Sequence, residues 1–338
     1  MRKLLTAAVA ASTALVATPA AAAAPAPVRC GDTITQDTTL RGDLVCAGAG
    51  LTVAASGVVL DLDGHLLRAG EGPAVLVQPS AEGEGLADVT VRRGRVVGDV
   101  AVYETDRLVL SRLDVDGLVD GYLVDDASVR ASRIRGSLAL QYAVRPLVQG
   151  NRIENDTDRP AVSLLAIAPR VVGNAVRAGG RDGVQLVESN ADERGTISGN
   201  TISGAEAGVS LPYLGSDVDV TANRISDSVH GVAVTGYGHR DVRIDLNDVS
   251  RTSGAAVVVE GAETEGSFSI SRNRVRDAGG DGIRYLPDTT YGTAAAVVER
   301  NDVRGVAGRG IDAPVATGGR NRVRGAGLSP ACVGPACR

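Results

Sequence analysis

Three side chains in the second half of the sequence have the chemistry of a base, a cation and an acid. His230 and Tyr237 lie seven residues apart, and Arg284 follows later in the chain. His230 or Arg284 would remove the C5 proton of a uronic acid. Arg240 or Arg284 would neutralise the sugar carboxylate, and Tyr237 would protonate the leaving oxygen. Because β-elimination needs these three parts, we predict His230, Tyr237 and Arg284 as catalytic residues of a polysaccharide lyase-like site.

Other polar side chains would line the same groove. Asp182 and Asp281 precede a glycine, as His230 does, so the three are expected along one edge of a common groove. The predicted substrate-binding residues are Asp182, Tyr213, His239, Arg240, Asp281 and Asp312. In the alternative interpretation, Asp182, His230 and Asp281 are solvated turn residues ahead of a glycine.

The elements that must position these side chains are short strands in a repeat. An asparagine recurs two residues before an Ile or Val, at intervals of 20 to 28 residues. The positions are Asn151, Asn174, Asn200, Asn223, Asn247, Asn273, Asn301 and Asn321. Because no segment between them is long enough for a helix, each interval predicts one coil of a β-solenoid with three short strands.

The asparagine column itself is expected to be structural. Identical positions in successive coils of a solenoid lie about 4.8 Å apart, the spacing of neighbouring strands. An asparagine amide can both donate and accept along such a column, and asparagine tolerates the left-handed backbone of a sharp corner. We therefore predict that these residues form the corners and hold the coils together.

Alternation in the strand that begins at a GV or GI pair predicts which residues are buried. Val184, Val209 and Val232 are expected inside, and Gln185 and Ser210 outside. The predicted outward column is Leu76, Ala101, Leu123, Ala139, Ser163, Gln185, Ser210, Ala233, Val258, Arg284 and Asp312. Most members are small or apolar, which favours a face that packs on a loop or partner.

Tyrosines follow this strand in several coils. They are Tyr103, Tyr142, Tyr213 and Tyr237. A tyrosine ring offers an apolar face and a hydroxyl, so a row of them would stack on sugar rings. The alternative is that the rings cover the edges of the coil.

The beginning of the chain indicates export. Residues 1–24 hold Arg2 and Lys3, an apolar run and then small residues, which is typical of a secretory signal peptide. We expect an N-terminal cap segment over 25–56, the β-solenoid over 57–325 and a C-terminal cap segment over 326–338. The mature protein is expected to be secreted, extracellular and monomeric, without a membrane span.

Four cysteines lie near the two ends of the mature chain. They are Cys30, Cys46, Cys332 and Cys337. In an exported protein an even number at these positions predicts two local disulfides, although four cysteines allow three pairings. Metal ligation is the alternative, but no histidine lies near them in the sequence.

Nearly all of the mature chain resembles secreted bacterial right-handed parallel β-helix proteins of the pectin-lyase-like superfamily. The resemblance lies in the opening text CGDTITQDTTLRGDLVCAGAGLTVAASGVVLDLDGHLLRAG and in the short repeats from about Val89 to Gly327. It implies an all-β solenoid of about eleven to twelve three-strand coils. It implies no single activity, because the superfamily holds lyases, hydrolases and epimerases. The aspartate set of polygalacturonase-type hydrolases and the DPHD motif of mannuronan epimerases do not occur in this sequence.

The charge balance limits the partners. Loss of Arg2 and Lys3 changes 35 basic residues to 33 against 40 acids, so the formal net charge moves from −5 to −7. Net acidity with few aromatics argues against nucleic-acid binding. Ca²⁺ is the cation that Asp125 with Asp126, or Asp156 with Asp158, would suit, but such pairs are more often simply exposed acids.

Two functions agree with these patterns. The first is recognition of an extracellular acidic polysaccharide, with lyase activity as the candidate reaction. The alternative is a non-catalytic cell-surface or matrix scaffold that binds a protein partner. The group of His230, Tyr237 and Arg284 favours the enzyme, whereas the apolar outward column favours the scaffold.

Overall fold

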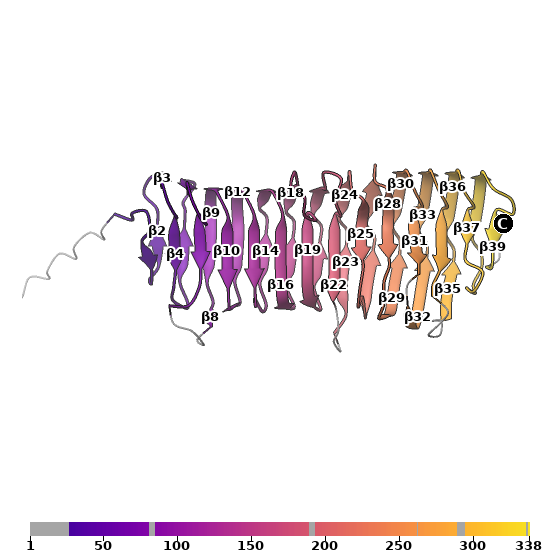
Figure 1. Cartoon of the computed structure of the whole chain (residues 1–338), viewed down its shortest axis with the longest axis horizontal. Coiled ribbons are helices and arrows are strands. Elements are labelled where there is room, and N and C mark those ends of the chain that lie inside the picture. Colours follow the sequence, from indigo (N-terminus) through magenta and orange to yellow (C-terminus); the bar gives the residue numbers. More distant parts are fainter. Residues whose placement is uncertain (1–26, 81–84, 189–192, 262, 289–294, 336) are drawn as a thin grey trace, which may run out of the picture.

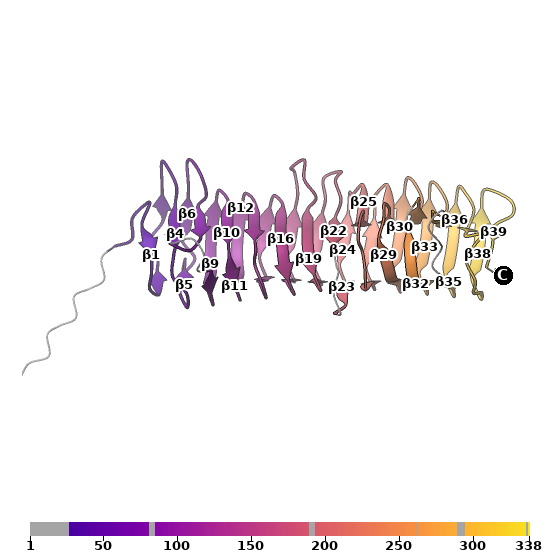
Figure 2. The same cartoon turned by 60° about the horizontal axis from the view of Figure 1, so that its bottom comes forward.

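Stacked coils of short parallel strands form an elongated rod (Figures 1 and 2). The computed structural model describes residues 27–80, 85–188, 193–261, 263–288, 295–335 and 337–338. The fold is a right-handed parallel β-helix of about 12 turns, as predicted. The described residues include no helix, and therefore none long and apolar enough to cross a membrane. The predicted signal peptide at 1–24 lies outside the described residues.

One face of the rod, here called the groove sheet, takes a strand from each coil. Its 14 strands are β1 (Thr33–Ile34), β4 (Leu51–Val53), β7 (Val75–Val77), β10 (Val100–Tyr103), β13 (Val119–Tyr122), β16 (Leu138–Val144), β19 (Val162–Ile167), β22 (Val184–Glu188), β25 (Ala207–Leu211), β28 (His230–Val234), β31 (Val257–Glu260), β34 (Ile283–Leu286), β37 (Ile311–Asp312) and β39 (Cys332–Val333). Both predicted cap segments thus contribute strands to this sheet.

The other two faces are the second and third sheets, in the order in which the chain reaches them after the groove sheet. The second sheet contains β2 (Thr38–Thr39), β5 (Val59–Asp61), β14 (Ser128–Arg130), β17 (Leu147–Gln149), β20 (Arg170–Val172), β23 (Gly195–Ser198), β26 (Val218–Thr221), β29 (His239–Asp245), β32 (Thr264–Ser271) and β35 (Ala295–Glu299). The third contains β3 (Leu44–Val45), β6 (Leu66–Arg68), β15 (Arg133–Arg135), β18 (Arg152–Glu154), β21 (Ala175–Arg177), β24 (Thr201–Ser203), β27 (Arg224–Ser226), β30 (Asp248–Thr252), β33 (Arg274–Ala278), β36 (Asp302–Val306) and β38 (Arg322–Ala326).

Two long strands run from the second sheet into the third, and one short pair stands apart. The long strands are β9 (Thr90–Val97) and β12 (Val109–Asp116), each of which pairs on both sides of the corner. The short pair is β8 (Leu86–Ala87) with β11 (Thr105–Asp106).

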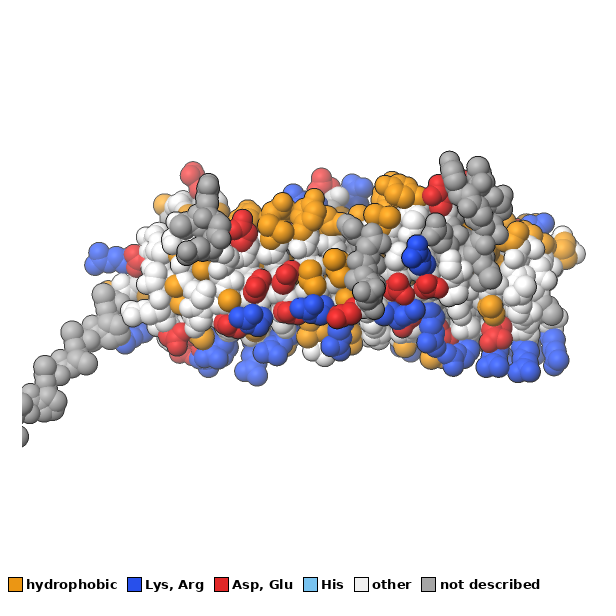
Figure 3. Space-filling model, turned by 90° about the horizontal axis from the view of Figure 1, so that it is seen from below, with side chains coloured by type: hydrophobic (Ala, Val, Ile, Leu, Met, Phe, Trp, Pro, Cys, Tyr) orange, Lys and Arg blue, Asp and Glu red, His pale blue; other side chains and the backbone are white. Residues whose placement is uncertain are grey.

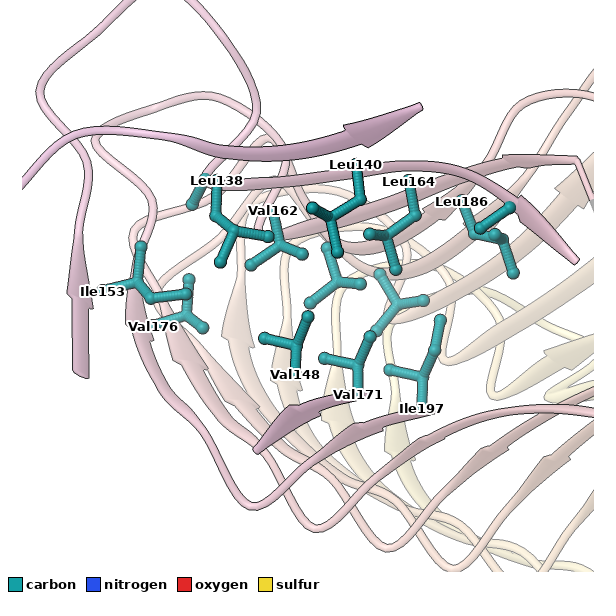
Figure 4. Packing of buried hydrophobic residues seen from close by; sticks show 14 of the residues in the cluster. Leu138, Leu140, Val148, Ile153, Val162, Leu164, Val171, Val176, Leu186 and Ile197 are labelled. Carbon is teal, nitrogen blue, oxygen red and sulfur yellow. The ribbon is translucent and has the colours of Figure 1, made fainter. Parts of the chain in front are cut away.

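The core is a set of apolar columns that run along the rod axis. Figure 4 shows Leu, Val and Ile side chains from successive coils stacked on one another inside the coil. Val184, Val209 and Val232 are fully buried, as the alternation predicted. Each coil therefore buries its apolar residues against the coils on either side, which is why a single repeat could not be stable alone.

The outward column of the groove sheet differs from the prediction in one coil. Asp120, and not Leu123, pairs with Ala101 and Ala139 in register. Leu123 lies beyond this strand, because β13 begins at Val119 and ends at Tyr122. Gly121 faces the interior, since a Cβ there would lie 2.8 Å from Leu140 Cδ2.

Ser210 was predicted to be exposed, and this is wrong. It does lie in the outward column, paired with Gln185, but only 8% of its surface is accessible. Its outward neighbours Ala233 and Val258 are buried as well, and they form a small apolar cluster with Ala207 and Ala255. The outward column of the groove sheet is therefore almost inaccessible to solvent in these coils.

The asparagine column forms a continuous hydrogen-bonded ladder. The backbone N–H of Asn223 donates to Asn247 Oδ1 at 3.0 Å, and Asn223 Nδ2 donates to the same oxygen at 3.0 Å and to Ile197 O at 2.9 Å. Asn223 Oδ1 in turn accepts from the backbone and side chain of Asn200. All eight asparagines have 2% or less of their surface exposed. Their structural role is confirmed.

The left-handed residue at this corner is not the asparagine, which corrects the prediction. It is the residue before it, such as Gly199 (φ 64°), Ala222 (φ 55°) or Leu246 (φ 57°). The asparagine lies just inside the corner, where its amide can reach both neighbouring coils. At the N-terminal end of the ladder Ser132 takes this place, donating its N–H to Asn151 Oδ1 and accepting from Leu113 N.

Two disulfides tie the ends of the rod, as predicted. Cys30 bonds to Cys46, and Cys332 bonds to Cys337. Disulfides of this kind are typical of proteins in an oxidising compartment.

We predict that Asn223→Ala lowers the free energy of unfolding by about 3 kcal/mol or more, because the amide groups of Asn200 and the carbonyl of Ile197 lose buried partners. Chemical denaturation followed by circular dichroism measures the change. Thr201→Ala, at an exposed position of a neighbouring strand, is the control. An Asn223→Ala protein as stable as this control would contradict the structural role of the ladder.

A second prediction concerns Asp245, which is buried at the end of β29. Burial raises its pKa, but hydrogen bonds from Arg272, Ser271 and Arg243 outweigh burial and hold the pKa of Asp245 below the usual value. Its ionised form therefore stabilises the fold above about pH 4, and this stability is lost as the pH falls through the lower folded pKa.

Asp245→Asn should cost about 2 kcal/mol at pH 7, and the difference from the unmodified protein should shrink toward pH 3. Denaturation curves at several pH values provide the measurement. A difference that stays constant over this range would show that the Asp245 charge does not contribute.

Candidate functional site

Asp182, His230 and Asp281 lie along one edge of the groove sheet, where its strands begin. We call it the leading edge. His230 pairs in register with Ala207, and Asp182 and Asp281 each lie two residues before the paired residues of β22 and β34. Two coils separate His230 from each aspartate, a distance of about 10 Å.

The two aspartates of the leading edge are used to order turns. Asp182 accepts the backbone N–H of Ala207 at 3.1 Å and the side chain of Gln185 at 3.2 Å. Asp281 accepts the backbone N–H of Arg309 at 2.7 Å. This geometry agrees with the turn interpretation of these residues.

His230 is half-buried and oriented by one hydrogen bond. Its Nδ1 lies 3.0 Å from the carbonyl oxygen of Ala255. Because a carbonyl only accepts, Nδ1 carries the proton, and Nε2 of the neutral ring keeps its lone pair. The ring packs on Gly254, where a Cβ would lie 2.7 Å from His230 Cε1. His230 is thus the one predicted catalytic residue with the chemistry of a base.

The three predicted catalytic residues are not brought together. Tyr237 lies beyond the far end of β28, whose five residues span about 13 Å. Arg284 lies two coils further along, and its Nη2 forms an ion pair with Glu260 Oε1 at 3.0 Å. In β-elimination the base and the acid act on neighbouring atoms of one sugar. His230 and Tyr237 lie on opposite edges of the sheet, so they cannot act as the base and the acid on the same sugar.

The structure places His239, a predicted substrate-binding residue, inside the protein. It is fully buried, its Nε2 lies 2.7 Å from Thr235 O, and its Nδ1 accepts from Gly215 N at 3.2 Å. Burial lowers the pKa of His239, although these two hydrogen bonds raise it. The neutral ring ties together the two loops that carry Tyr213 and Tyr237.

Two other predicted binding residues are also away from a common site. Arg240 lies on β29, in the second sheet, beyond the corner that ends the groove strand. Asp312 is on the groove sheet, but Arg309 Nη1 donates to its carboxylate at 3.0 Å.

The opposite edge of the groove sheet, where its strands end, carries a row of exposed tyrosines. We call it the tyrosine edge, and its members are Tyr103, Tyr122, Tyr142, Tyr213 and Tyr237. Between 41% and 54% of each residue is exposed. Figure 3 shows apolar side chains gathered along the upper edge of that view.

The rings of this edge occur in two contacting pairs. Tyr122 and Tyr142 lie edge to face, and Tyr213 and Tyr237 are tilted, each with ring centroids 5.3 Å apart. Tyr122, which pairs in register with Tyr103, is not among the tyrosines predicted from the sequence. The correct start of β13 at Val119 would have revealed it.

An apolar depression lies beside the first tyrosine pair. It encloses about 190 Å³ and is lined by Tyr142, Ala143, Val144, Leu165, Ala166 and Ile167. Its walls offer the flat apolar contact that the face of a sugar ring or an apolar side chain prefers.

The acids considered for Ca²⁺ have other roles where the structure explains them. Asp126 pairs with Arg145, and Asp125 accepts the backbone N–H of Val144. In the part of the chain that the structure describes, no group of three or more His, Cys, Asp or Glu residues could hold a metal ion.

Comparison with known proteins gives the fold and little more. Residues 168–325 match the family model for the right handed beta helix region. No curated protein matches the sequence. Among solved structures, the catalytic domain of a GH87 α-1,3-glucanase in complex with nigerose is 12% identical, with a TM-score of 0.51, over 96% of this chain and 70% of that one.

Two further structures are less similar. The siphovirus 9NA tailspike receptor-binding domain is 9% identical, with a TM-score of 0.48, over 91% of this chain and 72% of its own. The family 28 exopolygalacturonase of Yersinia enterocolitica is 9% identical, with a TM-score of 0.46, over 92% and 71%. The coil, its register and the match over residues 168–325 together identify the fold of the chain as a right-handed parallel β-helix.

Proposed function

We propose that the protein recognises an extracellular polysaccharide along the tyrosine edge. The observation that carries this function is the row of half-exposed tyrosine rings at the ends of three successive groove strands, β10, β13 and β16, and after two further ones, β25 and β28. Each ring offers a flat apolar face to a sugar and a hydroxyl to its polar groups. Because coils repeat about every 4.8 Å along the rod, a linear glycan laid along this edge would meet several rings.

The tyrosine edge is held in place before any ligand arrives. His239 bonds to Thr235 and Gly215, which fixes the two loops around Tyr213 and Tyr237. The loops also pack closely, since a Cβ at Gly236 would lie 2.7 Å from Tyr213 Cδ1. Rings that are already ordered lose little conformational freedom on binding, which favours affinity.

The fold agrees with a role in glycan recognition. The catalytic domain of the α-1,3-glucanase that was seen in complex with nigerose is similar to this chain in structure. Binding without cleavage is the activity we propose for this chain. His230 and Tyr237, the candidate base and acid, lie on different edges of the groove sheet, and the candidate cation Arg284 is in an ion pair.

The tyrosine edge does not itself favour an acidic glycan. Glu104 directly follows Tyr103 and is exposed, and Arg284, the predicted carboxylate partner, already pairs with Glu260. Uncharged sugar faces therefore fit this edge best. A protein partner is the second candidate, favoured by the apolar depression beside Tyr142.

We predict that a Tyr122→Ala, Tyr142→Ala double variant binds its glycan about tenfold more weakly or worse, because two stacking contacts are lost. Affinity gel electrophoresis with α-glucans, pectin, alginate and glycosaminoglycans measures this. Leu328→Ala, another exposed apolar truncation, should bind normally. Unretarded migration of the unmodified protein in every glycan would refute carbohydrate recognition and leave the protein partner.

We also predict that the protein releases no unsaturated ends from polygalacturonate, alginate or glycosaminoglycans, with or without Ca²⁺, because β-elimination needs its base and acid at one sugar. Ultraviolet absorbance of the products measures this. Unsaturated ends that form with the unmodified protein and disappear with His230→Ala would establish a lyase built around His230.

A further inference from the structure

Each coil turns its corners through residues with left-handed backbone angles, and at two of the three corners several of these residues pair as opposite charges on neighbouring coils. Between the groove and second sheets Asp88, Arg107, Asp126 and Arg145 follow one another. Arg107 donates to Asp88 at 2.7 Å and Arg145 to Asp126 at 2.8 Å. Further along this corner Asp217 and Asp241 are neighbours of like charge, and Arg194 donates to Asp217 at 3.4 Å. Figure 3 shows alternating acidic and basic side chains across the middle of that view.

The corner between the third sheet and the groove sheet holds similar pairs. Asp227, Arg251 and Asp277 follow one another there with left-handed angles. Arg251 donates to Asp227 at 2.7 Å, and this hydrogen bond, with a weaker effect from Ser226, lowers the pKa of Asp227 to about 2. At these positions, therefore, the left-handed arginines have an acid on a neighbouring coil as a partner.

The corner between the second and third sheets is richer in arginine. After Asp63, its left-handed residues are Arg93, Arg112, Ala131, Gly150, Gly173, Gly199, Ala222, Leu246, Arg272, Arg300 and Arg320. Arginine follows arginine at both ends of this series. Acids neutralise part of this charge, since Arg93 pairs with Asp61 and Asp63, and Arg272 pairs with Asp245.

The N-terminal part of this corner forms a groove. Arg92, Ser111 and Arg130 pair in register in the column next to Arg93 and Arg112. Together with Ala131 these residues line a space of about 550 Å³, here called the arginine groove. The protein as a whole carries a net charge of −5, so this concentration of guanidinium groups is local.

Two of the four arginines have no acidic partner. Arg92 and Arg93 both donate to the buried carboxylate of Asp61, at 2.8 and 2.6 Å. For Arg112 and Arg130 the described residues provide no ion pair, and both side chains are exposed. The donors of these two guanidinium groups are therefore available to an anion from solution.

We propose that the arginine groove binds the carboxylate or sulfate groups of an acidic polysaccharide. A guanidinium group presents a planar fork of donors that matches either anion, and neighbouring coils repeat that fork along the rod. No aromatic residue lines the groove, so it lacks the stacking platform that single-stranded nucleic acids use. The groove and the tyrosine edge lie on opposite sides of the second sheet, so each binds independently of the other.

The test removes the two unpaired charges and compares the result with the removal of two paired ones. In Arg112→Asn, Arg130→Gln, asparagine tolerates the left-handed angle of position 112. The control Arg107→Asn, Arg145→Asn changes the net charge equally, also at left-handed positions, but on the corner where both arginines are paired. Binding is measured by calorimetry with polygalacturonate, dextran sulfate, neutral dextran and oligo-dT, after matching thermal unfolding midpoints.

The unmodified protein should bind polygalacturonate or dextran sulfate, and whichever binds identifies carboxylate or sulfate as the group recognised. The Arg112, Arg130 variant should bind it about tenfold more weakly or worse, and the control should bind as the unmodified protein does. Equal weakening in both variants would mean that only net charge matters. Absence of binding to both acidic polymers, or equally tight binding of oligo-dT, would overturn the assignment.

The two proposed sites can fail separately. The Tyr122→Ala, Tyr142→Ala variant should keep its affinity for the acidic polymer, and the Arg112, Arg130 variant should keep the tyrosine-dependent affinity for glycans. Loss of both affinities in both variants would mean that the two surfaces are not independent sites.

Discussion

The buried asparagine ladder is the interaction on which the rest of the structure depends. Each asparagine side-chain NH2 group donates to the asparagine of the next coil and to a backbone carbonyl of the previous coil, and its oxygen accepts from the asparagine of the previous coil. The same residue type can therefore satisfy all of these hydrogen bonds in every coil. Because a buried amide without partners is costly, the ladder requires every coil to keep the same height and corner. That constraint turns the outer surface into straight rows of equivalent positions.

The chemistry of the protein is found at the corners and edges of these rows, and not on the floor of the groove sheet. The floor is small, apolar and largely shielded around Ala233 and Val258. The edge where groove strands end carries the tyrosines, and the corner between the second and third sheets carries unopposed arginines. A single coil geometry therefore presents different ligand chemistry on different sides of one rod.

Sequence periodicity was sufficient to predict the fold. Alternation identified the buried valines, and the regular asparagine identified the coil, because both patterns repeat within one coil and its neighbours. Errors arose where a local pattern had two interpretations. Gly121 stands inside β13, whereas other groove strands follow a glycine, so the sequence pattern favours Leu123 over Asp120 for the outward column.

The site was harder to predict than the fold. His239 was taken for a binding residue because it is polar and follows a groove strand, but it is buried by the approach of loops from two coils. The hydrogen-bond partner of His239, Gly215, and the ion-pair partner of Arg284, Glu260, each lie one coil earlier in the chain. The sequence of a single coil does not reveal such partners. Arg112 and Arg130 also become recognisable as neighbours only when the coils are placed in register.

The ladder does not run the full length of the rod, because it ends at Ser132. The coils before it hold Leu113 and Gly94 at the same position, and side-chain bonds between these coils run instead through ion pairs such as Arg93 with Asp61 and Arg107 with Asp88. Neighbouring coils are therefore joined in two ways, by a buried amide ladder over most of the rod and by partly exposed ion pairs near its N-terminal end. Salt screens exposed charges but not buried neutral amides, so the coils that hold the arginine groove and Tyr103 should respond to ionic strength more than the coils that hold Tyr213 and Tyr237.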